Sequence, residues 1–222
     1  MITVHHLENS RSHRILWLLE ELEVDYAIEE YKRDPKTKLA PDSLRKVHPL
    51  GKSPVISDEE RTVAESGAII EYILDVHGDG KLRPEEGTDA YLRYRYWMHY
   101  AEGSAMTPLL LDLVFGMLPR ESPWPVRPLV KLISKGVRGE FIHPRVEQHA
   151  GYWEEELSAY DYFAGDAFTA ADIQMSFPLE GLTTSDKWRK KYPRVVAYLD
   201  RVRNRPAYKR AVDRGGELSL DM

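Results

Sequence analysis

The first third of the chain alternates between short apolar strands and helices that are apolar on one face. Residues 2–7 form a predicted strand, and a second is predicted at 26–31. Between them lies a predicted helix whose apolar residues recur at one-face spacing: Ile15, Leu18, Leu19 and Leu22. A strand, a helix and a strand within so few residues indicate a right-handed crossover and a parallel strand pair.

The pattern then changes to a hairpin followed by a helix. A short helical stretch at 41–47 leads to a strand at Val55-Ile56, and the polar turn Asp58-Glu59-Glu60 returns the chain as a strand at 61–64. A helix at 66–76 would bury one apolar face, made of Ile69, Tyr72, Ile73 and Val76. The order β-α-β-α-β-β-α is that of a thioredoxin-like domain.

Beyond residue 78 the pattern is helical. We predict an α/β thioredoxin-like domain over 1–78, a Gly- and Pro-containing linker over 79–87 and an all-helical domain over 88–222. A long helix at 88–117 should end at a loop containing Pro119, Pro123, Pro125 and Pro128.

Later helices are predicted around 146–160 and 195–202. Between them, Thr169 and Asp172 form a capping box that opens a helix, which Pro178 should kink or end. From Gly215 onward the tail should be loose.

Composition and charge exclude several classes of partner. The chain has 222 residues, 42% of them hydrophobic, and 31 Lys+Arg against 36 Asp+Glu give a net charge of -5. This balance favours neither nucleic acid nor an anionic membrane. There is no cysteine, so disulfides, CxxC chemistry and thiolate metal sites are excluded. The N-terminus lacks a signal core and no run approaches the ~18 apolar residues of a membrane span, so we expect a cytoplasmic protein.

The segment GKSPVISDEERTVAESGAIIEYI (51–73) carries the most specific chemistry. Pro54 has no N–H and must stand at the start of the strand Val55-Ile56, leaving backbone nearby free to pair with a ligand by β-augmentation. Glu65 and Ser66 precede an apolar helix, where the first N–H groups and the positive dipole end point outward. Such a pocket suits an amino-acid zwitterion, with Glu65 binding the ammonium and Ser66 the carboxylate.

These residues also carry a family resemblance. KSPVI with ESGAIIEYI, and NSRSHRILWLLEEL near the start, resemble the N-terminal domain of cytosolic glutathione S-transferases of the serine type, theta-like or a related bacterial or fungal subclass. FTAADIQMSFPL resembles the family's helix-opening motif in the C-terminal domain. The resemblance implies glutathione as co-substrate, a cis peptide bond at Pro54 and a homodimer joining the first domain of one subunit to the second domain of the other.

The expected catalytic task is to ionise the glutathione thiol, because the thiolate is the nucleophile. A hydroxyl between the first strand and the first helix would serve, and Ser10 matches the position of the catalytic serine in theta-like members of the family. Helix capping alone would also explain Ser10 or Ser12. Asn9 is an alternative donor. Arg14 is expected to orient the loop or to neutralise Glu20 or Glu21, outside the site.

The remaining glutathione contacts follow from the resemblance. Lys52 would reach the glycine carboxylate, although by itself it would be read as a solvated surface lysine. Ser53 and Val55 flank Pro54, and backbone beside the proline would pair with the cysteinyl unit. Charge could also come from the approach to the site, which carries Arg45, Lys46 and His48.

A second substrate, an electrophile, would lie between the first-domain loop and the long helix. The candidate residues for this pocket are Tyr96, His99, Tyr100, Ser104 and Met106, with Trp124 from the proline-rich loop. Aromatic and methionine side chains at helical spacing are more often core than pocket, and that alternative stays open.

Other site types do not fit. Gly51-Lys52-Ser53 imitates the end of a P-loop, but Lys46 occupies the place of the required first glycine. The eight histidines include no HExxH pair, so we expect no metal, and the chain has no GxSxG elbow.

The sequence therefore predicts a detoxifying glutathione transferase acting on small, largely apolar electrophiles, with peroxide reduction as a variant. The alternative is a non-catalytic glutathione-binding or protein-interaction module with the same fold.

Overall fold

Four strands form a single sheet in the N-terminal half of the molecule. The computed structural model describes residues 1–37 and 39–219, and it places β1 (Ile2–Leu7), β2 (Tyr26–Tyr31), β3 (Val55–Asp58) and β4 (Arg61–Ala64) in one sheet with the order β2-β1-β3-β4. β1 runs parallel to β2, whereas β3 runs antiparallel to both β1 and β4. The predicted parallel pair and hairpin are therefore confirmed.

Three helical elements complete this half: α1 (His13–Leu22), the 3-10 turn η1 (Asp42–Lys46) and α2 (Ser66–His77). α1 buries both its predicted apolar face and most of its remaining residues, because it packs under α2, α7 and α10. Its first turn follows directly from the loop after β1, so residues 8–12 are held at the carboxyl end of the central strand.

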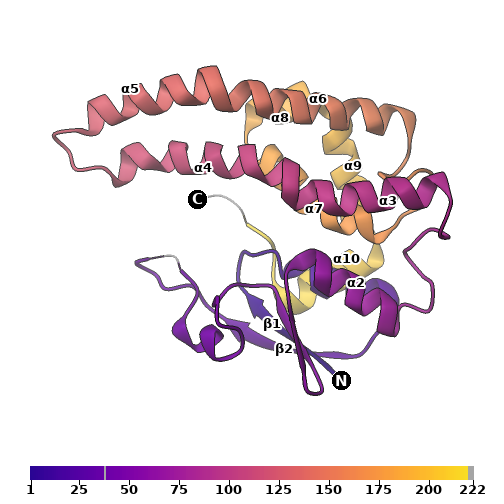
Figure 1. Ribbon diagram of the computed structural model, residues 1–222. Coiled ribbons are helices and arrows are strands. Elements are labelled where there is room, and N and C mark those ends of the chain that lie inside the picture. The colour runs from indigo at the N-terminus through magenta and orange to yellow at the C-terminus, as the bar shows by residue number, and fades with distance from the viewer. Residues whose placement is uncertain (38, 220–222) are drawn as a thin grey trace.

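The second half is helical and lies beside the sheet-bearing half (Figure 1). It begins with one long helical segment, made of α3 (Asp89–Tyr100), the π-helical turn η2 (Ala101–Ala105) and α4 (Met106–Glu121). Thr88 caps it, its Oγ1 accepting a hydrogen bond from the Tyr91 N–H at 3.2 Å. An 18-residue window in this segment, 17% buried, has the length and mean hydropathy of a membrane span. The prediction concerned uninterrupted apolar runs, and mean hydropathy tolerates the polar residues that interrupt this one.

The predicted proline-rich loop is shorter than expected: residues 122–126, with Pro123 and Pro125, connect two helices, and the outer two prolines lie within those helices. Pro119 lies inside the last turn of α4, and Pro128 lies in the first turn of α5 (Arg127–Val137), a helix that the sequence analysis missed. A proline in a first turn costs little, because the N–H it lacks would have no partner within the helix. The chain continues through the π-helical turn η3 (Arg138–Ile142) into α6 (His143–Ala159).

The capping box predicted at Thr169 is present and opens α7 (Ala170–Thr183). The helix does not end at Pro178, one of the two outcomes predicted, and nearly all of its residues are buried by surrounding helices. The remaining helices are α8 (Asp186–Lys191), α9 (Pro193–Arg203) and α10 (Pro206–Gly215). The segment predicted to be loose is attached up to Ser219, whose N–H donates to Asn9 Oδ1 at 2.9 Å, and residues 220–222 lie outside the described part.

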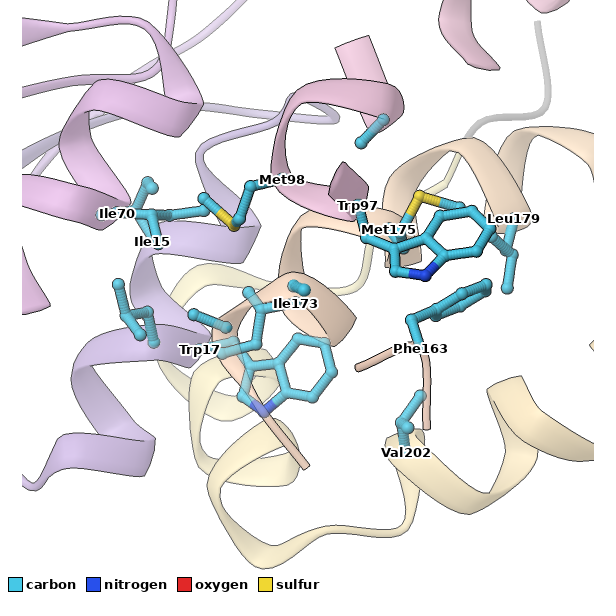
Figure 2. Packing of buried hydrophobic residues seen from close by; sticks show 14 of the residues in the cluster. Ile15, Trp17, Ile70, Trp97, Met98, Phe163, Ile173, Met175, Leu179 and Val202 are labelled. Atoms are coloured by element: carbon cyan, nitrogen blue, oxygen red, sulfur yellow. The ribbon is translucent and has the colours of Figure 1, made fainter. Parts of the chain in front are cut away.

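One continuous hydrophobic core joins the two halves. It includes Ile15 of α1 and Ile70 of α2 together with Met98 of α3 and Ile173 of α7. Figure 2 shows these side chains between the ribbons of both halves, with Trp97, Phe163 and Met175 continuing the packing into the helical half. The site described next lies where the halves meet, so this core fixes both of its walls.

Candidate functional site

The loop between β1 and α1 places Ser10 in the wall of a cavity of about 680 Å³. Ser10 is 6% exposed. One wall of the cavity comes from this loop, from the segment before β3 and from the segment that joins β2 to η1, and the other comes from α4 and α7. The Ser10 hydroxyl can therefore contact a ligand that is bound between the two walls.

Ser10 belongs to a chain of buried hydrogen bonds. Its Oγ lies 2.8 Å from Ser12 Oγ, which lies 2.9 Å from His6 Nδ1. His6 Nε2 lies 2.9 Å from the carbonyl oxygen of Gly215, at the end of α10. On the cavity side, Ser10 Oγ lies 3.4 Å from Ser53 Oγ. Ser12 and His6 were not among the predicted site residues, because sequence spacing does not show that a strand residue and a helix cap meet.

Asn9 also lines the cavity, and its backbone adopts a left-handed conformation with φ 49°. Its side-chain oxygen accepts the Ser219 N–H, and its carbonyl oxygen accepts a bond from Arg33 at 3.1 Å. The Asn9 amide thus holds the C-terminal segment. Both predicted donors, Asn9 and Ser10, line the cavity.

The Ser53–Pro54 peptide bond is cis, as the resemblance implies. Ser53 lines the cavity and donates its hydroxyl to the His5 carbonyl at 3.2 Å. The predicted free strand edge at Val55 is wrong. β3 lies between β1 and β4, so Val55 is paired on both sides and is 1% exposed. Backbone available to a ligand therefore lies before the strand, at Ser53.

Lys52 is exposed at the rim of the cavity, as is Arg45. Gly51 brings these two residues together: its φ is +57°, and a Cβ there would lie 2.6 Å from Arg45 Cγ. A larger residue at position 51 would push the arginine away. Of the three approach residues considered from sequence, Arg45 is the one that lines the cavity.

Glu65 and Ser66 lie at the start of α2, close to Pro54 in the sheet. Ala64 pairs with Val55, so the next residue, Glu65, lies at the Pro54 end of the hairpin. Glu65 is exposed with φ 73°. Ser66 is 4% exposed and its Oγ accepts a bond from Arg14 at 3.0 Å. The charge of Glu65 is therefore accessible, and the hydroxyl of Ser66 already accepts a bond from Arg14, but neither residue is among those that line the cavity.

Arg14 pairs across the interface, not within α1 as predicted. Its guanidinium, 1% exposed, donates to Glu102 Oε1 at 2.6 Å and to the Gln174 carbonyl at 2.6 Å. Burial raises the pKa of Glu102, but the charges and hydrogen bonds of Arg14 and Arg11 outweigh it and bring that pKa below its ordinary value. The ion pair thus ties α1 to the helical half directly behind the cavity.

The electrophile candidates separate into two groups. Met106 lines the cavity. Tyr96 and Tyr100 stack on each other beside Trp97, and the Tyr100 hydroxyl bonds His149. His99 and Ser104 are exposed, and Trp124 is 82% exposed at the turn between α4 and α5. These residues face other sides of the long helix or lie beyond it, so the prediction of a shared pocket is wrong for them.

The apolar wall is built by residues that the sequence analysis did not assign to the pocket. Leu110 and Leu113 follow Met106 on one face of α4, and Phe177 of α7 lies opposite. Leu110 lies four residues after Met106 and Leu113 three residues after Leu110, and this one-face helical spacing is the signal that could have identified the two leucines. Arg11 lies over the Phe177 ring at 4.9 Å and closes the end of this wall.

The chain is similar in sequence to two family models and to curated proteins. The model of the "Glutathione S-transferase, N-terminal domain" matches residues 1–75, and that of the "Glutathione S-transferase, C-terminal domain" matches residues 134–210. Glutathione S-transferase 3 of Schizosaccharomyces pombe is 35% identical over 222 residues, covering 100% of this chain and 91% of the relative. Glutathione S-transferase 1 of Saccharomyces cerevisiae is 30% identical, covering 94% and 92%.

Solved structures agree. A glutathione S-transferase from Actinobacillus pleuropneumoniae superposes with a TM-score of 0.81 at 32% identity, covering 100% of this chain and 97% of that one. A sphingomonad glutathione S-transferase complexed with glutathione has the same fold, with a TM-score of 0.71 at 23% identity, covering 96% and 98%.

Proposed function

Because the chain belongs to the glutathione S-transferase family, we propose that its cavity binds glutathione with the sulfur against Ser10. The protein is a glutathione transferase and glutathione is its substrate. The observation that carries the finer assignment is the position of the Ser10 hydroxyl, 6% exposed, in the wall between the two halves.

Ser10 would stabilise the thiolate. Lowering a thiol pKa by one to two units takes about 1.4 to 2.7 kcal/mol. A charge-assisted hydrogen bond from a hydroxyl is worth about that much. The 6% exposure of Ser10 limits competition from water for this bond.

Charges at the two ends of the site suit a zwitterionic tripeptide. Lys52 on the rim would bind the glycine carboxylate, and Glu65 at the start of α2 would bind the ammonium. Ser53 backbone between them would pair with the cysteinyl unit. This division assigns glutathione binding to residues 1–78 and the second substrate to residues 88–222, joined by the linker at 79–87.

The apolar wall favours a small, largely apolar electrophile. Met106, Leu110, Leu113 and Phe177 offer hydrocarbon and ring surface on the side facing Ser10. The thiolate would form a bond to the electrophilic carbon, by addition or with expulsion of a leaving group. Reduction of a peroxide is a close variant, because it begins from the same thiolate. A detoxifying role in the cytoplasm is the corresponding biological assignment.

A homodimer belongs to the same proposal. α4 and α5 expose a series of large apolar side chains: Leu110, Val114, Leu118, Leu129, Leu132 and Ile133. Large exposed apolar side chains gathered on two packed helices are typical of an interaction surface. Sedimentation of the purified protein at several concentrations tests the assembly, and a monomer throughout would contradict it.

The test of function separates binding from turnover. Ser10→Ala should keep retention on glutathione-agarose but lower turnover of a generic aromatic electrophile about 10- to 100-fold, the loss of one such hydrogen bond. Glu65→Gln should lose retention. Ser158→Ala, which removes an exposed hydroxyl on α6, is the matched control and should change neither.

The competing assignment is a non-catalytic glutathione-binding module. Retention on glutathione-agarose with no turnover of aromatic electrophiles or peroxides by the unmodified protein would favour that alternative. Unchanged turnover in Ser10→Ala would remove the assignment of the serine.

A further inference from the structure

The hydrogen-bond chain behind Ser10 has a definite direction. The Gly215 carbonyl can only accept, so His6 carries its proton on Nε2 and its Nδ1 is an acceptor. Ser12 must then donate its hydroxyl to Nδ1 at 2.9 Å in preference to the Leu7 carbonyl at 3.3 Å, because two acceptors 2.9 Å apart would repel. With that proton committed, the short 2.8 Å contact is best satisfied by Ser10 donating to Ser12, in preference to the 3.4 Å bond that Ser10 can donate to Ser53. In this state the Ser10 proton points away from the cavity.

Ser53 does not offer a way around this arrangement. Its hydroxyl donates to the His5 carbonyl, so its oxygen can accept a bond from Ser10, but at 3.4 Å that bond is much longer than the 2.8 Å contact between Ser10 and Ser12. The Ser12 N–H also donates to Ser10 Oγ at 3.2 Å, which occupies one lone pair of Ser10. A thiol arriving at the other lone pair meets an acceptor, not a donor.

We propose that Ser12 and His6 form a proton relay that carries the thiol proton inward and turns Ser10 into a donor. This inference rests on the proposed function, in which the sulfur lies against Ser10. The S–H proton passes to Ser10 Oγ, the Ser10 proton to Ser12 Oγ and the Ser12 proton to His6 Nδ1. One S–H bond breaks and one N–H bond forms, so charge is conserved as a thiolate and an imidazolium. Every hydroxyl bond is reversed, and Ser10 now donates to the thiolate.

The surroundings of His6 suit a transient proton acceptor. Burial lowers the pKa of His6, so the ring is neutral at pH 7 before the thiol arrives, and the same burial opposes its protonation, which the charges around the ring must offset. Glu30 on β2 and the Gly215 carbonyl of α10 both favour the protonated ring. His13 on α1 would repel it, but burial lowers the pKa of His13 to about 4, so that neighbour carries no charge at pH 7. The new thiolate adds a negative charge two hydroxyl groups away.

The neighbouring histidine provides an internal comparison. His5 is 5% exposed, as is His6, and burial lowers the pKa of both. Its side chain bonds the Tyr31 hydroxyl at 3.1 Å and Ser57 Oγ at 2.9 Å, on the other face of β1. It has the same chemistry and burial without the connection to Ser10, so His5→Asn is the matched control.

The test is proton release when glutathione binds at pH 7. Calorimetry in buffers of different ionisation enthalpy measures the protons released, and ultraviolet absorbance measures the thiolate formed. In the unmodified protein, thiolate should form with far fewer than one proton released per thiolate, and the His6 Nδ1 resonance should move to that of a protonated nitrogen. In His6→Asn, the side-chain oxygen still accepts a bond from Ser12 but takes no proton. The pKa of the bound thiol should therefore rise by about one unit, which is a tenfold fall in its acid dissociation constant. Each remaining thiolate should then release one proton, and His5→Asn should behave as the unmodified protein.

The contrary results are equally defined. One proton released per thiolate in the unmodified protein, or an unchanged thiolate pKa in a folded His6→Asn, would overturn the relay. Ser12→Ala interrupts the chain at its middle and should reproduce His6→Asn. Ser10→Ala distinguishes failure of the proposed function from failure of the relay. If the thiolate pKa is unchanged in Ser10→Ala, the proposed function fails. If that pKa rises in Ser10→Ala but not in His6→Asn, only the relay is overturned.

Discussion

The two walls of the cavity are held in different ways. The wall from the sheet-bearing half is a network of short polar contacts, in which Ser10, Ser12 and His6 are 6% exposed or less. The wall from the helical half is apolar and open, and Leu110 there is 51% exposed. A rigid polar wall suits a constant substrate, and an open apolar wall tolerates electrophiles of different shape. Under the proposed function, one cavity would combine specificity for glutathione with breadth for its partner.

The largest effect should come from breaking the link between the walls. Glu102→Ala leaves the Arg14 guanidinium buried with two neutral acceptors, Ser66 Oγ and the Gln174 carbonyl. We expect the free energy of unfolding to fall by about 3 kcal/mol, measured by urea denaturation. Asp161→Ala, which breaks an exposed pair with Arg201, should cost less than about 1 kcal/mol. Equal losses in the two variants would contradict the buried link.

Acid should weaken the same link more gently. The pKa of Glu102 is lower in the folded protein than its ordinary value of about 4.3, so the unfolded chain binds the proton first. The stability from Glu102 is therefore fully present above about pH 4.3 and is lost as the pH falls through the lower folded value. The difference in unfolding free energy between Glu102→Gln and the unmodified protein should shrink over that range. A difference that stays constant would contradict the assignment.

The apolar wall should affect the electrophile alone. Leu113→Ala removes hydrocarbon from the face that also carries Met106, so kcat/KM for a bulky apolar electrophile should fall about tenfold while the KM for glutathione is unchanged. Trp124→Ala, at the far turn of the α4–α5 pair, should change neither. A loss in the tryptophan variant equal to that of the leucine variant would restore the pocket role predicted from sequence.

The smallest effect should come from the rim. Lys52 is exposed, and an exposed charge pair is worth at most about 1 kcal/mol. Lys52→Ala should therefore raise the KM for glutathione no more than about fivefold and leave kcat alone, with the effect fading at high salt. A large fall in kcat would place Lys52 in the chemistry instead.

The polar wall was the more predictable one, for a physical reason. Strand and hairpin patterns are local, and the position of Ser10 between a strand and a helix follows from adjacent residues. Likewise the capping box at Thr169 is a local pattern, and it is present. The edge at Val55 could not be predicted, because the order of strands in the sheet depends on distant pairing.

The apolar wall was less predictable, because a long helix offers apolar residues on several faces. Tyr100 and Met106 are equally suited by type, and tertiary packing sends the first into the core and the second to the cavity. Similarly, prolines predict breaks, but Pro119 sits in the last turn of α4 and Pro178 inside the packed helix α7. His6 and Gly215 are 209 residues apart, and their contact follows from the docking of α10 under β1 and α1.

The most direct measurement of the central claim is the position of the glutathione sulfur in a crystal of the complex. We predict the sulfur within hydrogen-bond distance of Ser10 Oγ, with the tripeptide backbone beside Ser53 and the apolar wall of α4 facing the sulfur. A sulfur turned away from Ser10, or a cavity filled by the protein's own side chains with glutathione bound elsewhere, would contradict it.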